Sequence, residues 1–582
     1  MKIDDRSFPK DEPTRWQAFV FSGKVWVHRM RRALRRSGKE PNALDTLPLA
    51  KDAEVLAQSV SPLYSTSTEA EFALQAGKVQ NLRRVAASLN GLFLPAGEIF
   101  SFWKNVPRPT ARRGFAPGRE LREGCIVPSI GGGLCQLTNS LYDAALTAGF
   151  EIVERHAHSR KLPGSMAEIG RDATVFWNYV DLRFRAPVDI QFEVRLSRWA
   201  LTVAFRRIGE ARAACAPVSR TVTDAPSVGP EAESCETCGV TSCFRNPSAT
   251  SLPKKTTTAW LVDAFWPEHD RYMASQKTPG DTLLLPLRSK QIGIGPYRWS
   301  TEGFAQVKQF PLFTLMRSFA SRKLAAQGPA RQRALLEMDE RLAVLCEKYI
   351  PYTALHIVVS QNLLPFLWRR GVLAGRSFDV LMTRLPLAHI ESQLEKAASV
   401  WSEAQMLRDF RADSELVAAE TEALAAAGKW ITPHTAVAAL AQDKAQLLQW
   451  EMPPARPRQR GTGVVFPAST LARKGAWELR GAARKTGVPI TLCRPVIEGD
   501  GFWNGCNIRP VDQDNWLGDA SLVVLPAWVE NQPRRLLSAI AAGIPVIATE
   551  ACGVTGLSGV SIVSPGSPSL LASAIAEMLA SS

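Results

Sequence analysis

The sequence predicts a multidomain α/β and α+β protein, in which an N-terminal α+β domain precedes two α/β lobes. The chain has 582 residues, well beyond the roughly 250–300 residues at which one hydrophobic core stops growing. Hydrophobic residues make up 46% and charged residues 21%, which excludes disordered and collagen-like chains. After residue 258 strand-like and helix-like segments alternate, as is typical of parallel sheets covered by helices.

The net charge and the number of cysteines indicate which partners and which cellular location to expect. Lys and Arg number 70 against 55 Asp and Glu, a net charge of +15, which favours an anionic partner. No nucleic-acid-binding motif accompanies this charge, so we expect phosphorylated donors and an anionic membrane surface as partners, and no nucleic acid. The 10 cysteines are too few for a disulfide scaffold, and no signal peptide or membrane-spanning run is evident. We therefore expect a cytoplasmic location, with peripheral contact at the inner face of the plasma membrane left open.

Residues 1–70 form a basic N-terminal segment. A cationic helix candidate runs from Trp16 to Arg36, and its apolar side chains could lie on an anionic membrane. A solvated basic face packed against the next domain is the alternative interpretation.

Residues 71–210 predict the α+β domain. Apolar residues at helical spacing predict one helix over Leu74 to Leu89, and a second is expected from near Leu134 to Gly149, after three glycines. The segments EIVERHAHS, ATVFWNYVDLRFR, DIQFEVRLSRW and LTVAFRRI then read as successive strands.

The richest chemistry of this domain lies around Cys135. Three glycines precede it, so its thiol is expected at the start of a helix, where the positive end of the dipole stabilises a thiolate. His156 and His158 alternate on one predicted strand and share a face, and Asp172 is expected to open the next strand. This order matches cysteine enzymes in which His activates the thiol and a carboxylate orients the His. A buried structural cysteine and a non-catalytic His pair are the alternatives.

Three segments of this domain are distinctive: NLRRVAASLNGLFLPAGEIFSFW, GRELREGCIVPSIGGGLCQLTNSLYDAALTAGFEIVERHAHS and GRDATVFWNYVDLRF. With them, residues from about 75 to 210 resemble the VanW domain, and GGGLCQLTNSLY is the most specific part of the resemblance. It implies a domain with a contextual link to cell-wall peptidoglycan, and it implies no particular reaction.

Residues 211–257 form a linker that carries a cysteine cluster. Its sequence SCETCGVTSCFRN supplies three thiols, Cys235, Cys238 and Cys243. A CxxC pair is typical of a structural zinc or iron–sulfur site, which needs a fourth ligand, and Cys215 and His269 are candidates for it. Unliganded or redox-active thiols are the alternative.

Residues 258–455 and 456–582 each predict an α/β lobe. Strands are expected at AWLVDAF and TALHIVVS in the first lobe, and at GVVFPAS, PITLCRP, SLVVLPA and IPVIAT in the second. Helices are expected over residues 392–411, 414–427, 475–485, 533–542 and 567–579.

Charged residues follow two strands of the second lobe. Arg473 and Lys474 stand at the entrance of a helix, where two cations and backbone N–H groups suit a diphosphate. Glu530 lies between a strand and the next helix, at the edge where α/β sheets bind ligands. Two unrelated helix starts with ordinary caps are the alternative.

Residues 258–582 resemble retaining nucleotide-sugar glycosyltransferases of GT-B type, which have two facing Rossmann-like lobes, one for the acceptor and one for the donor. The resemblance implies that Arg473 and Lys474 bind the donor diphosphate and that Glu530 faces the sugar. Ser538 stands where the family usually has a second glutamate that contacts the donor ribose. Further candidates for the acceptor cleft are His356, Gln361 and Asn362.

We therefore expect a bacterial-type VanW family protein with a glycosyltransferase domain, which transfers a sugar from a nucleotide-sugar donor to a cell-envelope glycan or precursor. Glycosyl transfer of this kind needs no cofactor, because basic residues and a helix dipole neutralise the diphosphate. Two alternatives stay open. One is a Cys-His-Asp thiol enzyme, amidase- or transpeptidase-like, acting on peptidoglycan-type peptides, and the other is a catalytically degenerate binding scaffold, which Ser538 favours.

Overall fold

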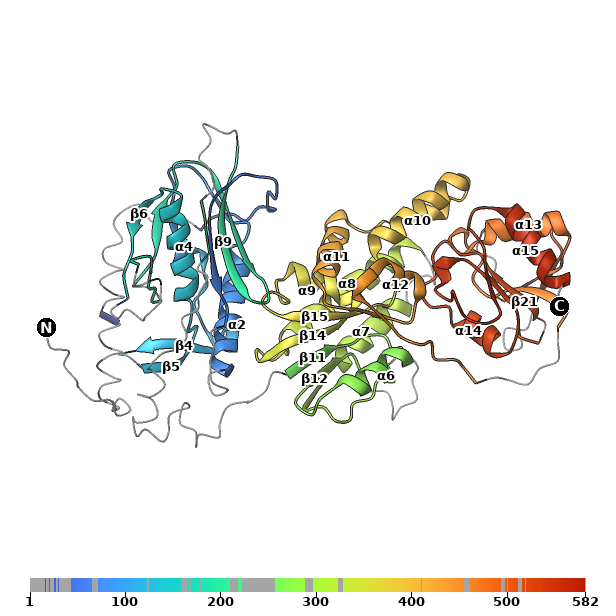
Figure 1. Cartoon of the computed structure of the whole chain (residues 1–582), viewed down its shortest axis with the longest axis horizontal. Helices are drawn as coiled ribbons and strands as arrows, with labels where there is room; N and C mark the ends of the chain where they lie inside the picture. The colour runs from blue at the N-terminus through green and yellow to red at the C-terminus, as the bar shows by residue number, and fades with distance from the viewer. Residues whose placement is uncertain are drawn as a thin grey trace. The chain divides into compact units, whose positions relative to one another are not determined.

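The computed structural model forms two compact units (Figure 1). Unit 1 comprises residues 1–257, 351–355 and 370–377, and unit 2 comprises residues 258–350, 356–369 and 378–582. The structure describes residues 43–64, 72–122, 125–158, 166, 169–177, 179–209, 218–221, 257–287, 297–322, 328–409, 411–454, 461–493, 498–499, 501–510, 516–518 and 520–580, with Trp16, Val20, Gly23, Trp26, Val27 and Met30. Most of the basic N-terminal segment and the cysteine cluster lie outside these residues.

Unit 1 is an α+β unit built on a largely antiparallel sheet. Its elements are β1 (Val55–Pro62), α2 (Phe72–Leu89), β2 (Phe93–Leu94), β3 (Ile99–Ser101), α3 (Phe102–Asn105), β4 (Pro117–Arg122), β5 (Cys125–Ile130), α4 (Cys135–Thr147), β6 (Glu151–Glu154), β7 (Arg183–Arg185), β8 (Ile190–Leu196), β9 (Ala200–Arg207) and β10 (Val218–Thr221). The main sheet has the order β10-β1-β9-β8-β2, beside a three-stranded sheet β3-β7-β6 and the hairpin β4-β5. Only the β1–β10 pair of the main sheet is parallel.

Helices α2 and α4 of unit 1 pack on these sheets and supply its core. Leu137 and Leu141, one turn apart on α4, are fully buried, because residues four apart lie on one face of a helix. On the paired strands β8 and β9, Phe192 and Phe205 meet with ring centroids 5.0 Å apart. Both helices start and end within two residues of the spans that the sequence predicts.

Unit 2 consists of two α/β lobes. The N-terminal lobe contains β11 (Thr257–Leu261), α6 (Pro267–Gln276), β12 (Thr282–Leu285), β13 (Gln306–Gln309), α7 (Pro311–Arg322), α8 (Pro329–Glu347), β14 (Ala354–Ser360), α9 (Leu364–Arg369), β15 (Ser377–Leu381), α10 (Leu387–Val400), α11 (Ser414–Ala426), β16 (Trp430–Thr432), α12 (Thr435–Ala441) and β17 (Ala445–Leu447). The C-terminal lobe contains β18 (Gly463–Phe466), α13 (Ala476–Thr486), β19 (Ile490–Leu492), β20 (Ile508–Pro510), β21 (Ala520–Leu525), α14 (Arg534–Ala541), β22 (Val546–Ala548), β23 (Val560–Ile562) and α15 (Pro568–Ala580).

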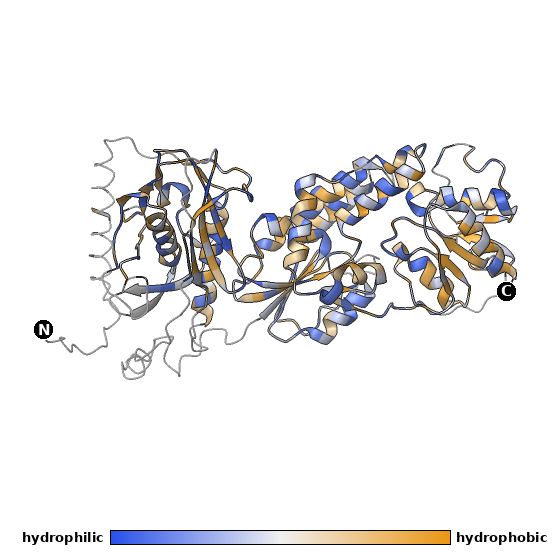
Figure 2. Cartoon of the chain, turned by 45° about the horizontal axis from the view of Figure 1, so that its top comes forward, coloured by the Kyte–Doolittle hydropathy of each residue, from blue (hydrophilic) through white to orange (hydrophobic). Residues whose placement is uncertain are grey.

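Each lobe has a doubly wound sheet. The strand order is β13-β12-β11-β14-β15-β16-β17 in the N-terminal lobe and β20-β19-β18-β21-β22-β23 in the C-terminal lobe. In each sheet the strand order reverses once, between β11 and β14 in the N-terminal lobe and between β18 and β21 in the C-terminal lobe. Doubly wound folds bind ligands at such a reversal. Figure 2 shows the C-terminal strands as hydrophobic, in agreement with the complete burial of β21. The predicted fold class, an α+β domain followed by two Rossmann-like lobes, is confirmed.

An ion pair between a buried carboxylate and a half-buried arginine joins the two lobes within unit 2. Arg534 on α14 donates to both carboxylate oxygens of Glu268 on α6, at 2.6 and 2.7 Å. The guanidinium carbon of Arg534 lies 5.3 Å from the ring centroids of both Trp266 and Trp450. Burial raises the pKa of Glu268, but the hydrogen bonds and charge of Arg534 outweigh burial and lower it.

Some predicted elements are wrong. The helix expected over residues 392–411 is α10, which begins at Leu387 and ends at Val400. It ends there because the backbone of Trp401 is no longer helical and its indole N–H donates to Glu478 at 2.7 Å. The strand expected over residues 151–159 is β6, which ends at Glu154. Beyond it the backbone N–H of His158 bonds to a carboxylate instead of a strand.

None of the helices in the described part of the chain combines the length and hydropathy that a bilayer-spanning segment requires.

Candidate functional sites

The first site lies at the start of α4 in unit 1. Cys135 is the first helical residue and is half-buried. The preceding turn needs glycine, because Gly131 and Gly133 have φ of 84° and 91°. A Cβ at Gly133 would lie 2.2 Å from Cγ of Lys78. A Cβ at Gly131 would meet Pro109 and one at Gly132 would meet Gly118 of β4. The three glycines therefore let the turn pack closely against α2, β4 and the loop around Pro109, and present Cys135 at the helix N-terminus.

Two side chains of α4 hold a second segment beside Cys135. The hydroxyl of Thr138 donates to the carbonyl of Ala173 at 2.6 Å, and Asn139 Oδ1 accepts the N–H of Ala173 at 2.8 Å. The residues on either side of Ala173 are thereby fixed against the helix. One of them, Thr174, places its Oγ1 3.5 Å from the sulfur of Cys135.

The other flanking residue, Asp172, orients His158. Its Oδ2 accepts the backbone N–H of His158 at 2.6 Å and lies 2.7 Å from Nδ1 of the same ring. Its Oδ1 accepts from Arg155 at 2.6 Å. Burial raises the pKa of Asp172, but the hydrogen bonds from His158 and the Arg155 charge outweigh burial and lower it. The carboxylate therefore stays ionised with its oxygens in use.

His158 in turn contacts the thiol. Its hydrogen bond to Cys135 raises the pKa of His158 to about 9, with a smaller contribution from Asp172. Burial raises the pKa of Cys135, but the hydrogen bond and positive charge of His158 more than offset burial and lower it. Both shifts favour the charged forms, a thiolate beside an imidazolium.

The structure distinguishes the two predicted histidines. His156 lies 3.3 Å from Glu154, and its side chain is 47% exposed. Neither histidine lies on a strand, and Asp172 does not open one, because the next strand is β7. The shared face expected for His156 and His158 is therefore wrong, and only His158 meets Cys135 and Asp172. Arg155 and Thr174 also belong to the site but were not predicted, and their positions next to His156 and Ala173 are the only signal that the sequence contains for them.

The second site lies at the strand-order reversal of the C-terminal lobe. Arg473 and Lys474 end a short turn after β18, and Glu530 follows β21. Lys474 Nζ lies 2.8 Å from Glu530 Oε2 and also donates to the Val529 carbonyl at 3.0 Å. A Cβ at Gly475 would lie 2.2 Å from the Pro526 carbonyl oxygen, so this glycine allows the two loops to meet.

These three charges are strongly coupled. Burial lowers the pKa of both Arg473 and Lys474 below its usual value, and the nearby Glu530 charge offsets only part of this effect. Burial raises the pKa of Glu530, but Lys474 outweighs burial and lowers it. The other carboxylate oxygen of Glu530 accepts the N–H of Gln532 at 2.9 Å. The loop after β21 is thus fixed around an ionised Glu530.

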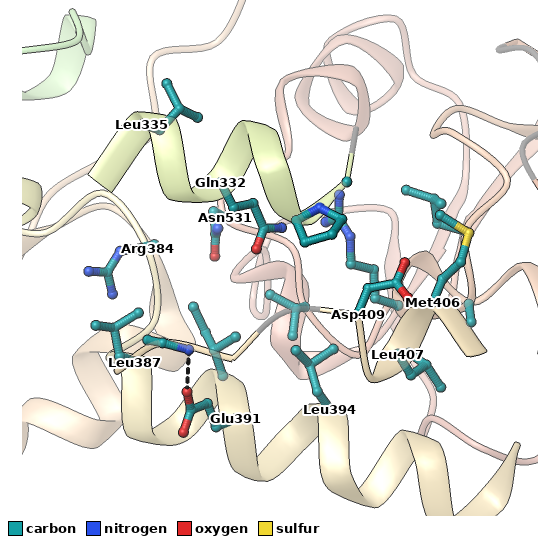
Figure 3. Close-up of a pocket in the computed structure, with 18 of the residues that line it drawn as sticks. Gln332, Leu335, Arg384, Leu387, Glu391, Leu394, Met406, Leu407, Asp409 and Asn531 are labelled. Atoms are coloured by element: carbon teal, nitrogen blue, oxygen red, sulfur yellow. Dashed lines mark hydrogen bonds between the residues drawn. The ribbon is translucent and has the colours of Figure 1, made fainter. Parts of the chain in front are cut away.

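A cavity of about 390 Å³ adjoins this loop (Figure 3). Its lining residues are Gly328, Pro329, Gln332, Leu335, Leu336, Arg384, Leu387, Ile390, Glu391, Leu394, Met406, Leu407, Asp409, Ala412, Leu471, Ala472, Arg473, Val529 and Asn531. Of the three predicted donor-binding residues, only Arg473 is among them. Asn531 Oδ1 is buried and has no hydrogen-bond partner among the described residues. The cavity therefore offers two cations, Arg384 and Arg473, and one unused acceptor, beside the carboxylates of Glu391 and Asp409 and a largely apolar remainder.

The remaining predicted site residues have other partners. His356 pairs with Asp379 at 3.3 Å. The Gln361 oxygen accepts the N–H groups of Thr383 and Arg384, and Asn362 donates to Asp263 at 2.7 Å. The hydroxyl of Ser538 donates to the carbonyl of Arg534 in its own helix at 3.0 Å. None of these predicted residues lines the cavity.

The predicted metal site falls outside the described residues, because Cys215, Cys235, Cys238 and Cys243 all do. His269 is buried, and its Nε2 lies 3.2 Å from the carbonyl oxygen of Ile431. Burial lowers the pKa of His269 to about 4. The described residues contain no cluster of His, Cys, Asp and Glu suited to a metal ion. The zinc or iron–sulfur site stays a prediction.

Fold and residues together define two classes of domain, and comparisons with known proteins name them. Residues 77–206 match the family model described as VanW like protein, and residues 507–581 match the model described as Glycosyl transferases group 1. The chain thus carries a VanW-like domain and a group 1 glycosyltransferase domain, and both resemblances are confirmed.

Curated relatives match the first domain. The chain is 33% identical over 135 residues to the vancomycin B-type resistance protein VanW of Enterococcus faecalis, covering 23% of this chain and 49% of that protein. It is 31% identical over 119 residues to the uncharacterized protein YoaR of Bacillus subtilis, covering 20% of this chain and 39% of that protein. The chain thus spans about half or less of the curated relatives it matches.

Solved structures match over 56% of the chain. Sucrose-phosphate synthase from Thermosynechococcus elongatus is 14% identical with a TM-score of 0.34, and 90% of it is covered. WaaG, a glycosyltransferase involved in lipopolysaccharide biosynthesis, is also 14% identical and 90% covered, with a TM-score of 0.31.

Proposed function

We propose that unit 2 is a glycosyltransferase that transfers a sugar from a nucleotide-sugar donor to a cell-envelope glycan or its precursor. The observation that carries the proposal is the cavity at the β18/β21 strand-order reversal, which Arg473 and Asn531 line. Cations at this edge of a doubly wound sheet suit a diphosphate. The group 1 glycosyltransferase match over residues 507–581 supports the same reaction class.

Each residue near the cavity has its own role in the proposed glycosyl transfer. Arg473 and Lys474 neutralise the donor diphosphate, so glycosyl transfer needs no metal or other cofactor. Glu530 accepts hydrogen bonds from the sugar hydroxyls, and Asn531 supplies a further acceptor. Ser538 bonds to its own helix, so the ribose meets no carboxylate at that position and nucleotide binding is correspondingly weak.

Isothermal titration calorimetry of the full chain with nucleoside diphosphates and nucleotide sugars tests this proposal. We expect binding of at least one donor, weakened about 10-fold or more by Arg473→Ala and by Lys474→Ala. Arg509→Ala, in the same lobe but outside the cavity lining, is the control and should bind normally. Absence of binding by every donor, or equal binding by all variants, would support the degenerate scaffold instead.

We also propose that the protein acts at the inner face of the plasma membrane. Helix α7 supports this, because four of its large apolar side chains are between 55% and 78% exposed: Leu312, Leu315, Met316 and Phe319. Their i, i+3, i+4, i+7 spacing forms one stripe, which we call the α7 apolar face. The helix contains no carboxylate and ends at Arg322. An anionic lipid surface complements both the stripe and the net charge of +15.

A further inference from the structure

We propose that Cys135, His158 and Asp172 of unit 1 form a second catalytic site, which transfers acyl groups from amide or ester donors through a thioester on Cys135. Glycosyl transfer in unit 2 uses none of these residues.

The contacts assign one role to each residue. Cys135 is the nucleophile, since its sulfur meets both His158 and the Thr174 hydroxyl. His158 is the acid and base, since its other ring nitrogen, Nδ1, lies 2.7 Å from Asp172 and thereby directs Nε2 toward the sulfur. Asp172 fixes the ring, and Arg155 in turn fixes Asp172 at 2.6 Å. A purely structural cysteine would need no such chain of oriented partners.

The helix start adds the donors that an acyl intermediate requires. The backbone N–H groups of Leu134 and Cys135 donate to no acceptor among the described residues. Such groups at a helix N-terminus can stabilise the negative charge that develops on a carbonyl oxygen under attack. Nucleophile, base and oxyanion donors thus gather at one helix end, which points to acyl transfer.

The reaction balances without an external oxidant or reductant. The Cys135 thiolate attacks the carbonyl carbon, a C–S bond forms, and the C–N or C–O bond of the donor breaks. The His158 imidazolium gives its proton to the departing amine or alcohol. Water or an amine then attacks the thioester, His158 takes a proton from it, and the C–S bond breaks to release the acid or the new amide and restore the pair.

The site is open to a reagent on one side. The His158 side chain is 24% exposed and Cys135 is half-buried, while Asp172 is only 2% exposed. Cys506 in unit 2 is also half-buried, and its sulfur contacts a backbone carbonyl at 3.7 Å. It therefore provides an internal comparison for Cys135.

The test uses the whole chain and two probes. With iodoacetamide, peptide mass spectrometry should show Cys135 alkylated at pH 7 at least 10-fold faster than Cys506. With p-nitrophenyl acetate, a burst of about one equivalent of p-nitrophenolate should accompany an acetyl group on the Cys135 peptide. His158→Asn should lower the pH 7 alkylation rate at least 10-fold and move its pH profile to that of an ordinary thiol.

Matched variants separate catalysis from folding. His156→Asn and Cys506→Ala should keep the burst, and Cys135→Ser should lose it with an unchanged far-ultraviolet circular dichroism spectrum. Equal alkylation of Cys135 and Cys506 at pH 7, or an acetyl adduct that forms and hydrolyses equally fast in His158→Asn, would overturn the proposal. Neither result depends on nucleotide binding, so this proposal and the glycosyltransferase proposal can fail separately.

Discussion

Lys78 is a half-buried cation beside the glycine turn that precedes Cys135. Burial, together with the positive charge of Arg119, lowers its pKa to about 7 from 10.5. No carboxylate among the described residues offsets that burial. The folded protein therefore holds the Lys78 proton less tightly than the unfolded chain does, and charging Lys78 works against folding.

The sign of the resulting pH dependence follows from linkage. Because the folded pKa is the lower one, the unfavourable contribution is complete below about pH 7 and fades as pH rises toward 10.5. We expect Lys78→Met to stabilise the protein by roughly 1 kcal/mol at pH 6 and to have little effect near pH 10. Thermal unfolding at both pH values measures this, with the exposed Lys396→Met as control. An equal shift at both pH values would contradict it.

For single residues, the sequence predicted which residues belong to the sites better than it predicted which of them contact one another. Cys135 and Asp172 were expected as partners because three glycines precede the cysteine and because the chain order of Cys, His and Asp matches cysteine enzymes. The choice of His158 over His156 depends on a coil in which backbone and side chain of one residue both bond to Asp172. No periodicity encodes such a coil. Asn531 was missed because its role depends on a cavity built from distant segments.

Helix α7 has one face that binds other residues of the chain and one apolar face that is exposed. Arg317 on its inner side binds Asp263 at 2.7 Å and Asp339 at 2.8 Å, which fixes the rotation of the helix. The α7 apolar face is consequently held outward. Because an exposed stripe of this kind is costly in water, it marks an interaction surface.

We expect the full chain to cosediment with vesicles that contain about a third phosphatidylglycerol, and the double variant Leu315→Glu/Phe319→Glu to bind at least 10-fold more weakly. Two inserted carboxylates oppose both apolar burial and the anionic surface. Leu570→Glu, at an apolar residue 56% exposed on α15, is the matched control and should bind normally. Unchanged sedimentation of the double variant would exclude α7 as the membrane contact.

Helices whose ends are determined by neighbouring residues in the sequence were predicted well. Helix α11 begins at Ser414, as expected, because Asp413 caps it by accepting the N–H of Glu415 at 2.7 Å. Helix α10 was misplaced, because its end depends on Trp401 contacting Glu478, 77 residues away in sequence. Tertiary contacts of this kind override local propensity.

The two lobes of unit 2 are coupled by the Glu268–Arg534 pair. Glu268 is fully buried, while the Arg534 side chain is 32% exposed. Removing only the arginine leaves a buried carboxylate without a counter-ion, which costs about 3 kcal/mol. The Trp266 and Trp450 rings beside Arg534 make the loss visible in tryptophan fluorescence.

A double-mutant cycle measures this coupling. We expect Arg534→Met to destabilise unit 2 by about 3 kcal/mol, and Glu268→Gln/Arg534→Met to recover at least about 1 kcal/mol of that loss. Thermal unfolding followed by tryptophan fluorescence supplies the values. Arg271→Met, which breaks an exposed pair with Glu451, should change stability by less than about 1 kcal/mol. Strict additivity of the two substitutions would mean that the pair does not link the lobes.

For the whole molecule, the fold class could be predicted because the α+β part and the α/β part have different patterns of strands and helices in the sequence. The alternation of strands and helices after residue 258 indicated two parallel sheets, and the strand order confirms them. The cavity could not be predicted, since its lining is drawn from segments between Gly328 and Asn531 that meet only after folding.

Under the proposed function, the 2.8 Å contact between Lys474 and Glu530 would make donor binding an exchange of counter-ions. Without ligand, Glu530 already pairs with the lysine, so a diphosphate bound at Lys474 would have to replace the carboxylate. The released carboxylate would then accept hydrogen bonds from the sugar hydroxyls. Recognition of the phosphate and recognition of the sugar would therefore be linked through one side chain, and a nucleotide without its sugar would leave Glu530 with no new partner.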